Sequence, residues 1–111
     1  MSKISFRDLI ARMAATFDPQ AAGNFAATIQ LHATGKEPGN YYLHIANGSC
    51  TFHEGVADSP TATIHTPSEI WISIISGETN AALAYLQGKF RVEGDKGLLL
   101  KMQELFKRPD A

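Results

Sequence analysis

The first apolar residues of the chain recur at helical spacing. In the stretch SFRDLIARMAATF they occupy positions 6, 9, 10, 13 and 17, which share one side of a helix. Ser5 stands before them as an N-cap, and Pro19 comes where a helix cannot continue. The pattern predicts an amphipathic helix that begins after Ser5 and ends before Pro19.

After this helix the apolar period changes to two. Every second residue from Phe25 to Ala33 is apolar, which is typical of a half-buried strand. Residues 41–54, YYLHIANGSCTFHE, contain Asn47-Gly48, a dipeptide that suits a type I′ hairpin turn. Short alternating segments at residues 62–65 and 90–92 predict two more strands, which makes five in all.

The hairpin also predicts which side chains face each other. A two-residue loop pairs Ile45 with Cys50 and Leu43 with Phe52 on one face, and His44 with Thr51 and Tyr42 with His53 on the other. The first face is apolar and the second is polar. We therefore expect helices to cover the sheet on one side only.

Three more helices are predicted for the covered side. Residues 66–69 read Thr-Pro-Ser-Glu, a capping box with proline at the first helical position, and Gly77 ends the helix that follows. A shorter helix ends at Gly88, and a strongly apolar helix covers residues 97–106. We expect the tail, residues 107–111, to fray. The order α-β-β-β-β-α-α-β-α predicts one α/β (α+β) domain over residues 1–111, a two-layer sandwich with a mostly antiparallel sheet.

A glycine-rich turn at residues 94–97 joins the last strand to the last helix, a place where many proteins bind phosphate. Its sequence, Gly-Asp-Lys-Gly, has neither the spacing of a P-loop nor the three glycines of a dinucleotide fold. Asp95 would also bring a negative charge to the phosphate position, whereas as an N-cap it accepts bonds from free N–H groups. We therefore interpret the turn as structural.

Composition argues against several classes of partner. The chain has 111 residues, a formal net charge of -1 and one cysteine, so nucleic-acid binding is disfavoured and no internal disulfide can form. The start MSKISFRDLI has no apolar signal-peptide core, and we expect a cytoplasmic location. No apolar run approaches the ~20 residues of a membrane span, so contact with a membrane would be transient and at its surface.

The four histidines raise the hypothesis of a metal or acid–base site, since all of them fall on the polar register of their strands. A metal site usually adds a carboxylate or a cysteine, but Cys50 is expected on the opposite face. That position also argues against a nucleophilic thiol, and no pair of carboxylates can be identified. We therefore predict no catalytic residue, no metal and no cofactor.

Many large apolar side chains of the predicted helices face one modest side of the sheet. Two interpretations remain open at this point. The residues can fill a solid core, as stripes of Leu, Met and Trp usually do, or they can enclose a cavity for an apolar ligand.

The second half of the chain resembles a known family. Between Ala62 and Phe106, a Thr-Ile strand leads into a helix that ends at Ser76-Gly77, and an apolar helix comes last. Between these two helices stand Ala84, Gly88, Lys89, Phe90, Val92, Gly94 and Asp95. This ordered set is similar to the sterol-carrier-protein domain family, sterol carrier protein type 2-like. The resemblance covers essentially the whole chain. Residues 109–111 do not form a peroxisomal address, so a peroxisomal location is not expected, and the short, compact form resembles a stand-alone bacterial-type member.

The resemblance implies a five-stranded sheet with helices on one face, enclosing an apolar tunnel for fatty acids, acyl chains, isoprenoids or sterols. The candidate lining residues are Phe52, Trp71, Ile74, Ile75, Leu83, Leu86, Phe90, Leu99, Met102 and Phe106. Non-catalytic binding and intracellular carriage of a lipid is the resulting hypothesis. The alternative is a scaffold that presents a lipid or quinone precursor to a lipid-modifying partner enzyme, through the polar sheet face around Tyr42, His44 and His53.

Overall fold

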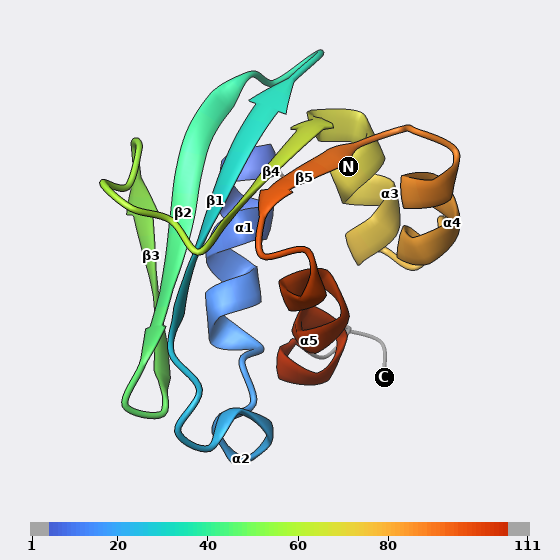
Figure 1. Ribbon diagram of the computed structural model, residues 1–111. Helices are drawn as coiled ribbons and strands as arrows, with labels where there is room; N and C mark the ends of the chain where they lie inside the picture. Colours follow the sequence, from blue (N-terminus) through green and yellow to red (C-terminus); the bar gives the residue numbers. More distant parts are fainter. Residues whose placement is uncertain (1–4, 107–111) are drawn as a thin grey trace.

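The computed structural model describes residues 5–106 (Figure 1). The helices are α1 (Phe6–Ala15), α2 (Pro19–Ala22), α3 (Ser68–Ile75), α4 (Ala81–Leu86) and α5 (Gly97–Leu105). The strands are β1 (Ala27–Thr34), β2 (Gly39–Ala46), β3 (Ser49–Glu54), β4 (Ala62–Pro67) and β5 (Arg91–Gly94). The predicted order of elements is confirmed, except for α2, which the apolar pattern did not predict. The predicted fraying of residues 107–111 concerns a segment outside the described residues.

Local sequence explains the additional helix α2. The carboxylate of Asp18 accepts hydrogen bonds from the backbone N–H groups of Gln20 and Ala21, at 3.0 and 3.4 Å. Pro19 occupies the first helical position, where a missing N–H costs little. A helix of four residues is too short to show an apolar period, so only this capping pattern could have predicted it.

The sheet has the strand order β3-β2-β1-β4-β5. Neighbouring strands are antiparallel, except that β1 and β4 run parallel. All four facing pairs predicted for the hairpin are confirmed. Asn47 and Gly48 have the positive φ values of a type I′ turn, 55° and 73°.

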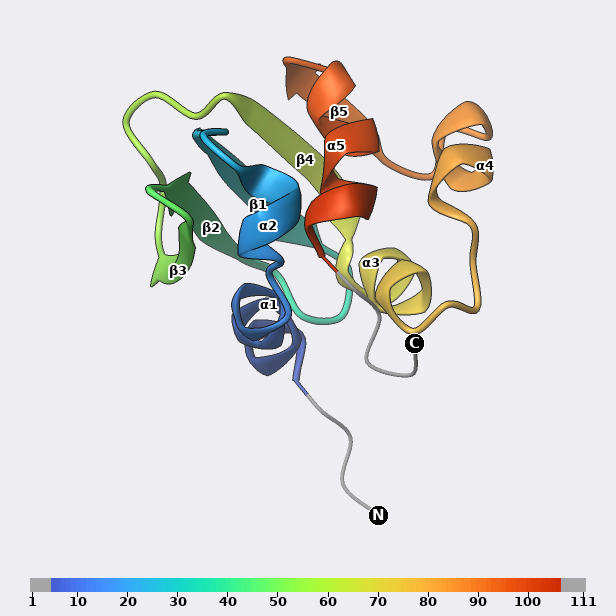
Figure 2. The same ribbon diagram turned by 90° about the horizontal axis from the view of Figure 1, so that it is seen from below.

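The helices lie on one side of the sheet, and α4 is outermost, beyond α3 (Figure 2). Alternate side chains of the central strands point toward the helices and are fully buried: Ile29, Leu31, Leu43, Ile45 and Ile64. Phe6 of α1 and Leu105 of α5 belong to the same buried cluster. The predicted fold class is therefore confirmed: a mostly antiparallel five-stranded sheet with helices on one face.

The segment that joins β3 to β4 crosses the other, outer face of the sheet (Figure 1). Gln30 of β1 is buried and bonds to the backbone of this segment. Its amide nitrogen donates to the Gly55 carbonyl at 3.0 Å, and its amide oxygen accepts from the Ala57 N–H at 2.7 Å. Val56, between these two residues, is 71% exposed.

The predicted capping box at the start of α3 is wrong. Strand β4 continues through residue 67, α3 begins at Ser68, and no side chain caps it. Thr66 Oγ1 instead donates to the carbonyl of the next residue, at 2.9 Å. Ser68 Oγ accepts the N–H of Glu37 at 3.0 Å, and Glu69 accepts that of Lys36 at 3.4 Å. Of the two side chains that would form the box, only Glu69 bonds to the loop between β1 and β2, and Ser68 beside it helps to hold that loop.

The predicted helix ends are confirmed. Gly77 and Gly88 follow α3 and α4 with φ values of 87° and 74°, and the turns after both helices have the two bonds of a Schellman motif. At the start of α5 the cap position is Lys96, one residue later than predicted. Asp95 nevertheless satisfies a helical N–H, because its carboxylate accepts from Gly97 at 3.0 Å. The turn therefore has the structural role that its sequence predicted.

Candidate functional site

The candidate site is the apolar interior between the sheet and helices α3, α4 and α5. Three of the predicted lining residues are buried in the core: Trp71 of α3, Phe90 before β5 and Met102 of α5, with 3%, 4% and 6% exposure. The indole of Trp71 meets the ring of Phe90 edge to face, and the ring centroids are 5.7 Å apart. Two predicted residues from different elements are thus in direct contact.

Tyr85 of α4 adds a third ring to this pair and was missed by the sequence reasoning. Its ring centroid lies 5.6 Å from that of Phe90. The residues expected from α4 were Leu83 and Leu86, but they are 54% and 80% exposed. Ala84 is fully buried and Tyr85 packs against the core, so α4 turns a different side inward. A helix of six residues carries too little apolar period to predict that side.

Trp71, Tyr85 and Phe90 form what we call the aromatic cluster. It joins α3, α4 and the residue before β5 through two ring contacts. Helices α3 and α4 lie side by side in Figure 1. Ile74 and Ile75, two further predicted lining residues on α3, are half-buried and pack against the same core. The surroundings of the cluster are therefore strongly apolar.

Helix α5 bounds the interior on another side. Leu98, Met102 and Leu105 are buried, Leu99 and Phe106 are half-buried, and Leu100 is 65% exposed. The ring centroid of Phe106 lies 5.9 Å from that of Phe17. The N–H of Asp18 donates to the carbonyl of Leu105 at 2.8 Å. The end of α5 is thus tied to the segment that links α1 and α2.

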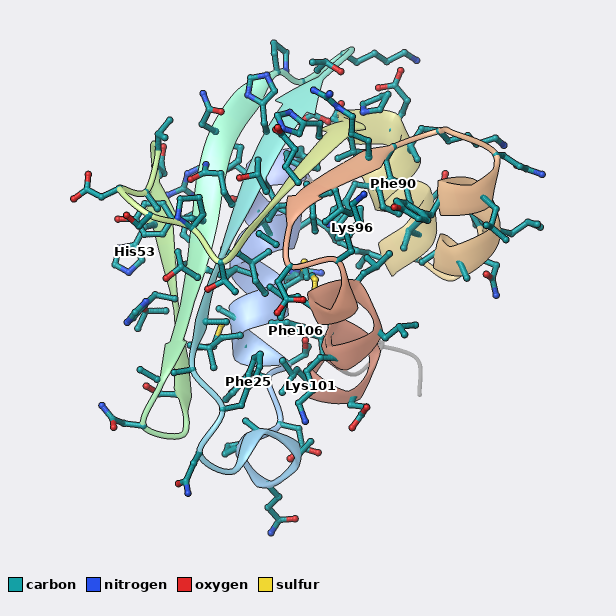
Figure 3. All side chains as sticks on the ribbon, in the orientation of Figure 1. Phe25, His53, Phe90, Lys96, Lys101 and Phe106 are labelled. Carbon is teal, nitrogen blue, oxygen red and sulfur yellow. The ribbon has the colours of Figure 1, made fainter. Side chains whose placement is uncertain are left out.

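Lys101 makes a second connection from α5 to the start of the chain. Its ammonium lies 5.5 Å from the ring centroid of Phe25, beside which it is drawn in Figure 3, and 3.5 Å from the carbonyl oxygen of Ala21. The contact brings the end of α2 and the residues before β1 against α5.

Phe52, the remaining predicted lining residue, lies in another part of the interior. Its ring stacks on that of Tyr41 with 5.9 Å between centroids, and the guanidinium of Arg7 lies 5.3 Å from its ring centre. Arg7 Nε also donates to the Glu54 carboxylate at 2.7 Å. Phe52 therefore packs beside α1 near the β3 edge, whereas the aromatic cluster lies near the β5 edge.

The four histidines lie on the outer face of the sheet, and each has a polar partner. His32 bonds to Asn40 at 2.7 Å, His44 to Thr28 at 3.0 Å, His53 to Thr51 at 2.9 Å and His65 to Glu93. The rings of His32 and His65 meet edge to face, and that of His53 stacks on Tyr42. Within residues 5–106, no three His, Cys, Asp or Glu side chains are arranged to hold a metal ion.

Cys50 is half-buried on the inner face of β3, where it pairs with Ile45 as predicted. Burial raises the pKa of its thiol to about 11. Because the thiolate is the nucleophilic form, a thiol with this pKa is unreactive at neutral pH.

Comparison with known families identifies the class of protein. Residues 6–107 match the model of the SCP-2 sterol transfer family, which covers almost the whole chain. The chain therefore belongs to this family, and the resemblance noted in its sequence is confirmed.

None of the helices between residues 5 and 106 has the length and hydrophobicity to cross a bilayer.

Individual relatives are distant and much longer. Hydroxysteroid dehydrogenase-like protein 2 from Xenopus tropicalis is 26% identical over 83 residues, which make up 74% of this chain and 20% of that protein. Sterol carrier protein 2 from Rattus norvegicus is 27% identical over 94 residues, or 85% of this chain and 17% of that protein. The chain thus spans about a fifth of the length of these curated relatives.

A solved structure of similar size supports the fold. The solution structure of palmitated SCP2L2 from Aedes aegypti has a TM-score of 0.72 with 21% sequence identity. The match covers 94% of this chain and 99% of that chain. The two chains therefore share the same arrangement of sheet and helices over nearly their full lengths.

Proposed function

We propose that this chain binds and carries a single-chain lipid, without catalysis, in an apolar tunnel between the sheet and helices α3, α4 and α5. The observation that carries the proposal is the match to the SCP-2 sterol transfer family over residues 6–107. The structurally similar Aedes aegypti protein was determined in a palmitated form, which supports a fatty acid as one ligand. The predicted lining residues and a cytoplasmic location belong to the same proposal.

The physical basis of the proposed binding is the burial of methylene groups. Each methylene removed from water contributes about 0.8 kcal/mol, so a long acyl chain binds well without a charged partner. The interior that α3 and α5 offer is lined by isoleucine, leucine, methionine and aromatic side chains. An apolar site of this kind selects lipids by length and shape. The binding free energies of lipids that differ by one or two methylene groups differ by only a few kcal/mol.

Native mass spectrometry and lipid titration test this proposal. Protein purified from cells is expected to carry a co-purified lipid, or to bind palmitic acid saturably with a change in Trp71 emission. Trp71 is the only tryptophan, so the signal has a single source. A protein that is purified without ligand and ignores fatty acids, isoprenoids and sterols alike would disprove the proposal.

A second candidate function is a scaffold that presents a lipid or quinone precursor to a partner enzyme. The favouring observation is the outer sheet face, where the ring of Tyr42 stacks on that of His53 with 4.8 Å between ring centroids. The helices lie on the other side of the sheet (Figure 2). A pull-down from the native host with the wild type and a Tyr42→Ala/His53→Ala variant separates the two functions. The scaffold is supported if a lipid-modifying enzyme is captured by the wild type only while both proteins bind lipid equally.

A further inference from the structure

Among the side chains that the structure describes, one buried polar atom has no hydrogen-bond partner: the indole nitrogen Nε1 of Trp71. The indole is 3% exposed, so water does not reach it from the surface. The buried polar side chains elsewhere are paired. Gln30 bonds to the backbone of residues 41, 55 and 57, Thr66 donates to the next carbonyl, and Ser68 accepts the N–H of Glu37.

The surroundings of Trp71 offer its N–H little to bond to. The indole packs edge to face on Phe90, Phe90 in turn packs on Tyr85, and half-buried isoleucines occupy the neighbouring positions of α3. A buried water needs two to four polar partners, and the ring of Phe90 and the isoleucine side chains of α3 supply none beside the indole. A buried donor without a partner is destabilising, and folded proteins keep few of them.

We propose that the Trp71 Nε1–H donates a hydrogen bond to an oxygen atom of the bound lipid. The inference rests on the proposed lipid-carrying function and adds a rule of selection to it. The indole N–H is a donor only and carries no charge, so its partner must be an acceptor such as a carboxyl or ester carbonyl oxygen. A hydrocarbon of the same length has no such atom. Trp71 therefore favours oxygen-bearing lipids and fixes the position of their oxygen beside the aromatic cluster.

Three probes of equal chain length separate this hydrogen bond from simple apolar burial: palmitic acid, methyl palmitate and hexadecane. Because Trp71 is the only tryptophan, the 15N-labelled full chain gives one indole N–H resonance in NMR spectra. We expect palmitic acid, methyl palmitate or both to move this resonance downfield, and hexadecane to leave it without a downfield shift. A response to the acid alone identifies a carboxyl acceptor, and a response to the ester identifies a carbonyl.

The variant Trp71→Phe keeps an aromatic ring and removes the donor. It is expected to weaken binding of the responding lipid by roughly five- to tenfold and to change hexadecane binding by less than about twofold. The denaturation midpoint of the lipid-free protein should fall only by what the smaller ring costs in packing, because the lost N–H itself had no partner. Leu99→Ala is the control. It removes apolar contact from α5 and should weaken the binding of all three probes to the same extent.

Two results would overturn the inference while leaving lipid carriage intact. One is an indole resonance that moves in the same way with hexadecane and with the oxygenated lipids. The other is a Trp71→Phe protein that loses the same affinity for all three probes. If the wild type binds none of the three, the proposed function fails and the inference fails with it.

Discussion

Gly94 and Gly97 stand three residues apart in the turn before α5, and their surroundings differ. Gly94 has a φ of +89°, and a Cβ added to it would lie 2.6 Å from the carbonyl oxygen of Thr61. Gly97 has no positive φ, and a Cβ there would meet only the side chain of Asp95, at 3.3 Å. The backbone of the turn thus passes so close to Thr61 that only glycine fits at position 94, and this need for a close approach explains the first glycine without any ligand.

Gly94→Ala is expected to lower the free energy of unfolding by about 1–3 kcal/mol, because it adds both a left-handed backbone strain and a clash with a carbonyl oxygen. Gly97→Ala is the matched control and should stay within about 1 kcal/mol of the wild type, since alanine suits the first turn of a helix. Urea denaturation followed by Trp71 emission measures both values. Equal losses in the two variants would contradict the structural role assigned to Gly94.

The thiol of Cys50 gives a second prediction at the scale of one residue. Burial raises its pKa from 9.0 to about 11, so at pH 8 the thiolate fraction of the folded protein is on the order of 100-fold below that of a free thiol. Modification by a thiol reagent such as DTNB should be slow in buffer and fast in denaturant. Reaction of the folded protein at the rate of a free cysteine would show that the thiol is not buried.

The same shift has a consequence for stability. The thiol ionises near pH 9.0 in the unfolded protein and near pH 11 in the folded one. The contribution of Cys50 to the free energy of unfolding is therefore complete below pH 9.0 and is lost as the pH rises through 11. Urea denaturation at several alkaline pH values measures the loss. The loss should be smaller in Cys50→Ala, which lacks the titrating group and therefore serves as the control. An identical pH dependence of the free energy of unfolding in both proteins would contradict the raised pKa of Cys50.

At the scale of elements, the sequence predicted the helices and strands whose positions follow from a long apolar period. It missed the start of α3, which depends on contacts with residues distant in the sequence. The positions of α1 and the β2–β3 hairpin follow from local period and from Asn47-Gly48, and both are confirmed. The start of α3 is different, because Ser68 and Glu69 bond to a loop more than thirty residues earlier. Local sequence predicts that Glu69 forms part of a cap there, and the tertiary structure uses its carboxylate to bind the loop instead.

The candidate site shows the same division. Trp71, Phe90 and Met102 were predicted to face the interior, and all three are buried, because each large side chain stands in a recognisable helix or strand pattern. The inward side of α4 could not be predicted, since six residues show no period and the sequence favoured Leu83 and Leu86 by size alone. The unpaired indole N–H of Trp71 has no signal in the sequence at all, because it depends on which acceptors the fold brings near.

Helix α5 offers a test of whether the interior is a tunnel or a filled core. Met102→Gln places an amide in the apolar interior, where burying it without a partner costs roughly 1–3 kcal/mol. If water enters the lipid-free interior, it solvates the amide there, and the penalty falls mainly on lipid binding. We therefore expect palmitic acid affinity to fall severalfold and the denaturation midpoint of the lipid-free protein to change little.

Leu100→Gln on the same helix is the control for Met102→Gln. Leu100 is 65% exposed, so the amide stays in water and neither affinity nor midpoint should change. A sharp fall in the midpoint of Met102→Gln, with unchanged affinity per folded molecule, would identify α5 as part of a filled core and would contradict the tunnel.

At the scale of the whole molecule, the two sides of the sheet differ in what they expose. The outer face carries the histidines and the crossing segment with Val56, whereas the helical side exposes Leu83 and Leu86 on α4 and Leu100 on α5. These leucines lie on the helices that bound the proposed tunnel. If the proposed carrier collects and delivers its lipid at a membrane, we expect these apolar side chains to contact the membrane surface during transfer.

The variant Leu83→Ser/Leu86→Ser tests this surface, and it also decides whether the two leucines line the tunnel. If they contact membranes, the transfer of a fluorescent fatty acid to phospholipid vesicles should slow severalfold, while its affinity stays unchanged and the free energy of unfolding changes by only about 0.5 kcal/mol, as is usual for exposed positions. Val56→Ser is the control, because it removes an exposed apolar side chain from the opposite side of the sheet and should leave transfer unaffected.

Transfer by the double variant at the wild-type rate would exclude α4 as the membrane contact. Loss of affinity would instead mean that α4 moves its leucines inward when lipid binds, and the lining role that the sequence predicted for them would then hold in the loaded protein.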